Sequence, residues 1–148
     1  MSEMLGNQYF MARNFVAAHA EFEGVLLKDP CNKLVGKKQI ICYTQIGEIK
    51  KALTLFRNLI DTDIKLITNT DPINDDCPCP EIIHQMKSNS PAYIDNEKNI
   101  MLGILWLYCD INESIRYFKM ASKEQKEDAS VQSILNKLQQ YQLSVARK

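Results

Sequence analysis

The feature that most constrains this chain is a pattern of large and small residues that returns after 34 positions. Moving the sequence along by that distance places large apolar residues on large apolar residues and small residues on small ones. The matched pairs are Tyr9 and Tyr43, Phe15 and Ile49, Ala18 and Ala52, Phe22 and Phe56, Val25 and Leu59, and Leu26 and Ile60. Self-similarity at such a period is typical of stacked repeats, in which each repeat is one supersecondary unit.

A third copy follows the second after 62 positions, which is one period plus an insertion of 28 residues. Its matched pairs are Tyr43 and Leu105, Ile49 and Ile111, Ala52 and Ser114, Phe56 and Phe118, and Leu59 and Ala121. Within each copy the apolar residues recur at intervals of three and four residues, which is the spacing of one helix face. The sequence therefore predicts an all-α chain.

Short breaks divide each copy into two helices. They fall at Arg13-Asn14, Gly47-Glu48 and Cys109-Asp110. Asn14 and Asp110 are good helix caps, and Gly47 tolerates a left-handed backbone. Small residues such as Ala18 would let the second helix approach the first, and large ones such as Phe22 would fill the space beside them. Each copy is thus predicted to be a pair of antiparallel helices.

The segment Leu5-Gly6, Tyr9, Asn14-Phe15, Ala18, Phe22, Val25-Leu26 and Pro30 resembles the tetratricopeptide repeat nearly position by position. A second copy runs through Tyr43, Gly47-Glu48-Ile49, Ala52, Phe56 and Leu59, and a third through Leu105, Cys109-Asp110-Ile111, Ser114, Phe118 and Ala121. The third copy departs from the family at Cys109 and Ser114, which stand at the usual glycine and small positions. Together the copies cover about two thirds of the chain. The resemblance implies an α-solenoid of three repeats.

We expect one tetratricopeptide-like domain over residues 1–148. Its parts are repeat one (1–32), repeat two (33–64), an insertion (65–94), repeat three (95–128) and a capping helix (129–146). The cap is expected because Val131, Ile134, Leu135, Leu138 and Leu143 continue at helical spacing, and the last repeat of an array must cover its apolar face. The first repeat begins almost at Met1, so either a partner covers that end or the array continues beyond it.

The insertion is rich in turn-forming residues. Thr68 to Pro80 holds three prolines and three aspartates and is predicted to be a surface loop. Glu81 to Lys87 could form one or two helical turns, and Ser90-Pro91 is a good helix start. Loops of this length are either disordered or functional. Both alternatives stay open.

Composition excludes several classes of function. The 18 Lys and Arg balance the 18 Asp and Glu, so no global field favours nucleic acid or anionic lipid. Ile100 to Tyr108, the most apolar stretch, is about half the length needed to span a bilayer. The chain begins without a secretory signal and holds five cysteines, which predicts reduced thiols in an intracellular protein, cytoplasmic or nuclear.

Candidate chemistry is scarce. Cys77, Cys79 and His84 are the only cluster of metal-ligand types, but Cys77-Pro78-Cys79 is tighter than the spacing of structural zinc sites. No phosphate-binding loop, dinucleotide fingerprint or catalytic triad is present. His19 is expected to be a surface or packing residue. We therefore expect that the chain is not an enzyme and binds no cofactor or metal. The weak alternative is a metal site formed by Cys77, Cys79 and His84.

The resemblance implies that the first helix of each repeat lines a concave groove. The groove residues transferred in this way are Asn7, Phe10, Met11, Lys37, Lys38, Ile41, Thr44, Gln45, Asn99, Gly103 and Trp106, together with Glu3, Ile100 and Leu107. Lys37 and Lys38 could attract an acidic group, and Phe10, Ile41 and Trp106 could take apolar anchors. Trp106 could equally pack inside the array.

The expected function is a non-catalytic scaffold or adaptor that docks a protein or peptide, as a subunit of a larger assembly. The alternatives are a self-associating, homodimeric or co-chaperone-like peptide binder and, more remotely, a metal-binding module. Family members that clamp the carboxylate terminus of chaperones use a lysine four residues before an asparagine. Asn7 matches that asparagine, but Glu3 stands at the lysine position, and Lys38, Asn96 and Ile100 stand at the other clamp positions. Glu3 would repel a carboxylate, which disfavours the co-chaperone alternative.

Overall fold

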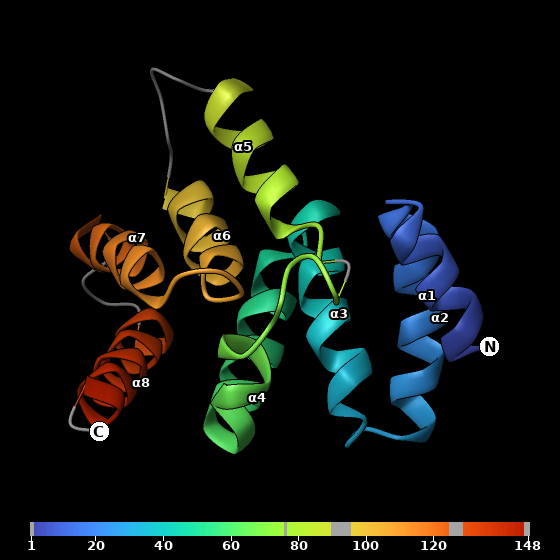
Figure 1. Cartoon of the computed structure of the whole chain (residues 1–148), viewed down its shortest axis with the longest axis horizontal. Helices are drawn as coiled ribbons and strands as arrows, with labels where there is room; N and C mark the ends of the chain where they lie inside the picture. Colours follow the sequence, from blue (N-terminus) through green and yellow to red (C-terminus); the bar gives the residue numbers. More distant parts are fainter. Residues whose placement is uncertain (1, 76, 90–95, 125–128, 147–148) are drawn as a thin grey trace. The chain divides into compact units, whose positions relative to one another are not determined.

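The computed structural model describes residues 2–75, 77–89, 96–124 and 129–146. These residues form helices and connecting turns and contain no strand, so the described chain is all-α as predicted (Figure 1). The helices are α1 (Glu3–Met11), α2 (Phe15–Lys28), α3 (Lys33–Gln45), α4 (Ile49–Thr68), α5 (Cys79–Asn89), α6 (Asn96–Trp106), α7 (Ile111–Glu124) and α8 (Ala129–Ala146). They divide into unit 1, Met1–Thr62, and unit 2, Asp63–Lys148.

Caps and left-handed residues set the helix boundaries of unit 1. The Asn14 side chain accepts from the Ala17 amide, and Asn32 caps α3 by accepting from Val35. Gly47 has φ +83°, and Arg13, one period earlier, has φ +62°. A residue in this region reverses the chain after a helix, at little cost for glycine and more for arginine. The predicted breaks at both positions and the Asn14 cap are confirmed.

The contact between α2 and α1 forms one part of the core of unit 1. A Cβ placed on Gly6 would lie 2.6 Å from Cε1 of Phe22, so only glycine lets the two helices approach this closely. Phe22 is fully buried and lies 6.2 Å, centroid to centroid, from Phe10. Ala18 is fully buried as well. The small and large positions predicted from the repeat therefore lie in the core.

Helix α4 is not continuous. Asp63 has φ −161° and ψ 71°, which interrupts the helical backbone at the boundary between the units. The hydroxyl of Thr62, one residue earlier, donates to the carbonyl of Asn58 and competes with the helical ladder there. The chain is helical again to Thr68, which carries helix into the first residues of the predicted insertion.

The glycine–phenylalanine contact recurs in unit 2. A Cβ on Gly103 of α6 would lie 2.8 Å from two ring carbons of Phe118 on α7. Ser114, fully buried at a position predicted to be small, donates its hydroxyl to the Gly103 carbonyl at 2.6 Å. A buried hydroxyl needs such a partner, which explains why serine is tolerated there.

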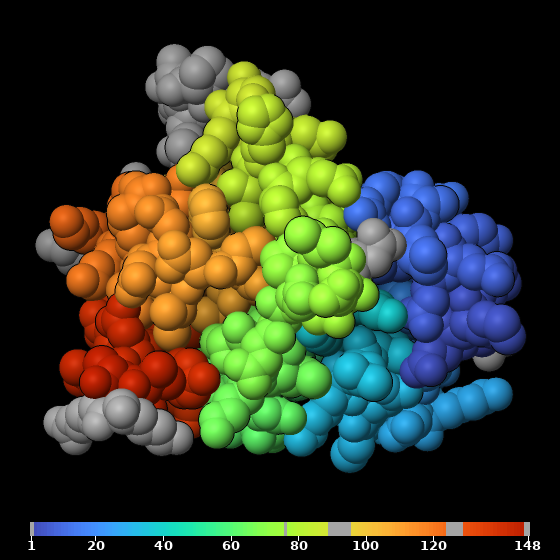
Figure 2. Space-filling model, viewed as in Figure 1, coloured from blue at the N-terminus to red at the C-terminus, as the bar shows by residue number. Residues whose placement is uncertain are grey.

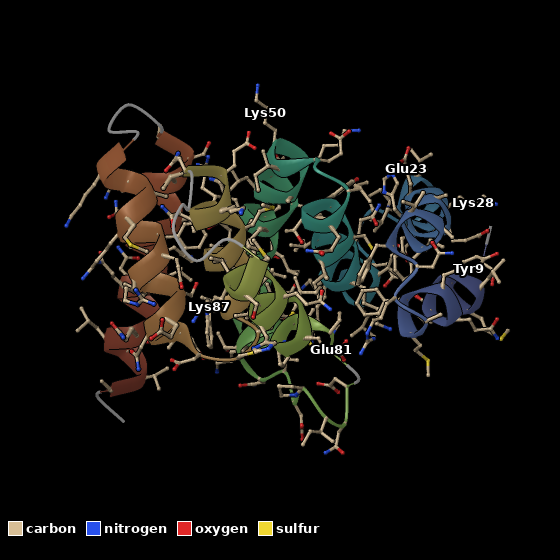
Figure 3. The ribbon with its side chains drawn as sticks, turned by 90° about the horizontal axis from the view of Figure 1, so that it is seen from above. Tyr9, Glu23, Lys28, Lys50, Glu81 and Lys87 are labelled. Atoms are coloured by element: carbon tan, nitrogen blue, oxygen red, sulfur yellow. The ribbon has the colours of Figure 1, made fainter. Side chains whose placement is uncertain are left out.

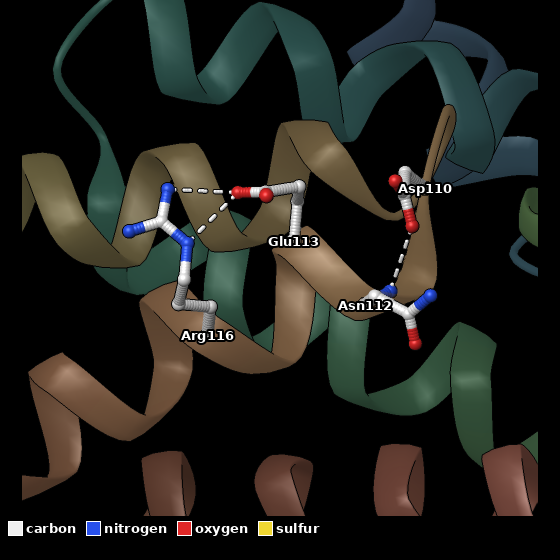
Figure 4. Close-up of polar contacts among 4 residues, drawn as sticks. All are labelled: Asp110, Asn112, Glu113 and Arg116. Atoms are coloured by element: carbon white, nitrogen blue, oxygen red, sulfur yellow. Dashed lines mark hydrogen bonds and ion pairs between the residues drawn. The ribbon is translucent and has the colours of Figure 1, made fainter.

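Helix α7 begins at the predicted cap. The Asp110 carboxylate accepts from the Asn112 amide at 2.9 Å, and Arg116 donates to Glu113 through two nitrogens (Figure 4). Helix α8 follows α7 and buries Val131, Ile134, Leu135 and Leu138. It covers the range predicted for a capping helix. None of the described helices is long and apolar enough to cross a membrane.

The insertion contains more helix than expected. Cys79–Asn89 is helical over a longer range than the turns predicted for Glu81 to Lys87, and residues 72–75 form turns within the predicted surface loop. Hydrogen bonds to the Asp71 carboxylate from the amides of Ile73 and Asn74 close these turns. The helix start predicted at Ser90-Pro91 lies outside the described residues.

Candidate docking surfaces

Helices α1 and α3 are joined by polar contacts on unit 1. Lys38 Nζ donates to Oδ1 of Asn7 at 2.8 Å, and Nδ2 of Asn32 donates to Oε1 of Glu3 at 2.9 Å. These contacts bring together the first helices of the two predicted repeats, including the groove residues Asn7 and Lys38. We call the surface formed by Asn7, Met11, Lys37, Lys38 and Gln45 the α1–α3 face.

The groove residues predicted in unit 1 differ in exposure. Phe10, Ile41 and Thr44 are buried, with Phe10 only 3% exposed because its ring packs against Phe15 and Phe22. Asn7, Lys37, Lys38 and Gln45 are half-buried, and Met11 is 63% exposed. Phe10 and Ile41, which were expected to anchor a partner, therefore lie in the core. The sequence did not reveal this because a repeating pattern cannot separate a position that faces the core from one that faces the groove.

Exposed methionines supply an apolar surface on α1, of which the sequence analysis included Met11 but not Met4. Met4 and Met11 are seven residues apart, so they lie on one side of α1, with Asn7 between them. Figure 2 shows side chains of α1 and α2, in blue, on the visible surface of unit 1. The sequence signal for Met4 was its position seven residues before Met11, which places both on one side of a helix.

The other three predicted groove residues lie in unit 2. Asn99 is buried, Gly103 is covered by Phe118, and Trp106 is half-buried. Lys87 of α5, labelled in Figure 3, places its ammonium group 5.1 Å from the centroid of the Trp106 ring, a cation–π contact. The indole nitrogen of Trp106 is buried without a hydrogen-bond partner in the described chain. Trp106 therefore contacts α5 through Lys87, and the sequence did not indicate this contact.

A second surface of unit 1 was not predicted. A cleft of about 360 Å³ lies among α2, α3 and α4. Its lining residues are Leu26, Tyr43, Lys50, Lys51, Thr54, Leu55 and Asn58. Lys50 extends from α4 away from the ribbon (Figure 3). The sequence carried one signal for this cleft, the pair Lys50-Lys51 directly after the Gly47-Glu48 break.

His19 serves packing between α2 and α3. Its Nδ1 lies 2.9 Å from Nε2 of Gln39, and its Nε2 lies 3.1 Å from Oε2 of Glu23. The amide nitrogen of Gln39 can only donate, so Nδ1 of His19 accepts and its Nε2 carries the proton toward Glu23. With both ring nitrogens engaged and Gln39 fully buried, the imidazole is held in one orientation.

Unit 2 contains three cysteines, of which Cys77 and Cys79 lie close together. The sulfurs of Cys77 and Cys79 are 2.9 Å apart. Burial, reinforced by Cys77, raises the pKa of the Cys79 thiol, and burial raises the pKa of Cys109 to about 11. Thiols with such pKa values stay protonated at neutral pH and are weak nucleophiles and ligands. In the part of the chain that the structure describes, Cys77, Cys79 and His84 form no group able to hold a metal ion.

No protein-family model matches this chain, and the searches of curated proteins and of solved structures likewise find no match.

Proposed function

We propose that this chain is a tetratricopeptide-type α-solenoid that acts as a non-catalytic scaffold, docking a protein or peptide partner as a subunit of a larger assembly. The recurring contact between a helical glycine and a buried phenylalanine supports the repeat assignment. It occurs between Gly6 and Phe22 in unit 1 and between Gly103 and Phe118 in unit 2. In both places the pair joins two helices that are consecutive in the chain.

The single observation that carries the docking proposal is the bond between Lys38 and Asn7. It makes α1 and α3 neighbours, and a surface shared by the first helices of successive repeats is what a repeat array offers to a partner. The Lys38 ammonium group brings a positive charge to this surface, and a carboxylate of the partner would be attracted to it there. Lys37 adds a second positive charge on the same helix.

The partner segment proposed for the α1–α3 face combines acidic and apolar side chains. The lysines would receive the acidic groups, and Met11, with Met4 beside it on α1, would receive the apolar ones. Methionine suits such a role because its unbranched side chain adapts to different shapes. The raised thiol pKa values of Cys79 and Cys109 disfavour these two residues as nucleophiles.

The test is affinity capture from cell extract with the tagged chain, followed by mass spectrometry and by measurement of binding to the purified partner. The variant Lys37→Glu with Lys38→Glu should weaken binding at least tenfold while the far-ultraviolet circular dichroism stays unchanged. The matched control is Lys119→Glu with Lys123→Glu, which makes the same charge change on exposed positions of α7. Equal affinity of both variants would remove the α1–α3 face as the site.

A further inference from the structure

The cleft among α2, α3 and α4 has apolar walls and a basic rim. Leu26 of α2 and Leu55 of α4 line it, together with the ring of Tyr43 from α3. Lys50 and Lys51 stand on the first turn of α4, and both are exposed. Its volume of about 360 Å³ is at the small end of the roughly 300–1,000 Å³ typical of ligand pockets. One or two side chains fill such a space.

The charges around this cleft are not balanced. In the described chain, neither the Lys50 nor the Lys51 ammonium group has an acidic partner within ion-pair distance. Their helix turn contains no acidic residue, and the amides of a helix start add positive potential. The sequence of unit 1 holds eight Lys and Arg against six Asp and Glu. A carboxylate bound at the rim of the cleft would be stabilised by this excess of positive charge.

We propose that this cleft is a second binding site, which takes an acidic peptide segment carrying one apolar side chain. The apolar side chain enters between Leu26 and Leu55, and flanking carboxylates meet Lys50 and Lys51. The site shares no lining residue with the α1–α3 face. It therefore goes beyond the proposed function, and it would let the chain hold two partner segments at once.

The test is a titration of the ¹⁵N-labelled full chain with a capped pentapeptide in which leucine stands between two pairs of glutamates. Peptide concentrations up to about 5 mM cover the weak affinity expected of so small a contact. Saturable amide shifts should centre on Tyr43, Lys50, Lys51, Leu55 and Asn58. Lys50→Glu with Lys51→Glu should weaken binding at least tenfold, and the control Lys119→Glu with Lys123→Glu less than twofold.

Two further peptides separate the contribution of the apolar side chain from that of the carboxylates, and inorganic phosphate tests for binding of a simple anion. Serine in place of leucine should weaken binding at least tenfold, and lysines in place of the glutamates should abolish it. Phosphate should not reproduce the shifts. The proposal is overturned by the absence of shifts, by equal binding of the lysine peptide, by identical shifts with phosphate, or by shifts confined to Asn7 and Lys38. If the Glu variant fails to fold, Lys50→Gln with Lys51→Gln carries the same test.

Discussion

Replacing Gly6 with alanine should destabilise unit 1, whereas the same replacement at Gly36 should stabilise it. Both glycines are buried in helices of unit 1. At Gly6 the added Cβ would lie 2.6 and 2.8 Å from two ring carbons of Phe22, a ring that also packs against Phe10. At Gly36 it would meet only Cδ1 of Leu55, at 3.9 Å. The contact at Gly6 is so short that the Phe22 ring or the helices must move, whereas the contact at Gly36 is an ordinary van der Waals contact.

The magnitudes follow from two opposing effects. Alanine favours a helix interior over glycine by roughly 0.5–1 kcal/mol. Overpacking a core costs roughly 1–3 kcal/mol. Gly6→Ala should therefore lower the free energy of unfolding by about 0.5–2 kcal/mol, and Gly36→Ala should raise it by about 0.5–1 kcal/mol. In a Phe22→Leu background the clash at Gly6 is relieved, so Gly6→Ala should cost at least about 0.5 kcal/mol less there.

The assay is urea unfolding followed by circular dichroism, with Trp106 fluorescence as a separate report on unit 2, since it is the only tryptophan. The Gly6 and Gly36 variants should move the circular dichroism transition in opposite directions. A Gly6→Ala variant at least as stable as the wild type would refute the close approach of α1 and α2. So would an equal cost of Gly6→Ala with Phe22 and with Leu at that position.

Phe22→Ala should cost about 3–5 kcal/mol and can unfold so small a unit, because it removes a fully buried ring; an almost unchanged melting temperature would show that the repeat register is wrong. A pH effect is expected at Cys42, where burial raises the thiol pKa from 9.0 to about 12. The unfolded chain releases this proton first, so the contribution to stability is complete below pH 9 and is lost between pH 9 and about 12, by at most roughly 1.4 kcal/mol per pH unit. Unfolding of wild type and Cys42→Ala at pH 8 and pH 10.5 should therefore give a smaller decline for the variant, and parallel declines would contradict the assignment.

The local features of the fold were readable from the sequence. Asn14 and Asp110 cap helices because their short polar side chains reach backbone amides, and Gly47 adopts the expected positive φ. Arg13 also has a positive φ, which its residue type does not indicate. Its position one period before Gly47 was the signal for this conformation. These features depend on a few neighbouring residues, so the chain itself specifies them.

Contacts between distant elements were harder to predict. Phe10 has the spacing of a groove residue but lies in the core, because the ring positions of Phe15 and Phe22 decide which side of α1 is covered. The contact of Lys87 with Trp106 joins the insertion to α6, and the cleft draws residues from three helices. Such groupings depend on helix rotation and packing, which periodicity leaves open.

Selection of peptides from a displayed library, followed by amide shift mapping of the best binder, tests the proposed scaffold function most directly. The account predicts enrichment of acidic segments with apolar residues, and shifts on α1 and α3 that include Asn7, Met11 and Lys38. No enrichment over an unrelated helical protein, or shifts that avoid both docking surfaces, would contradict it.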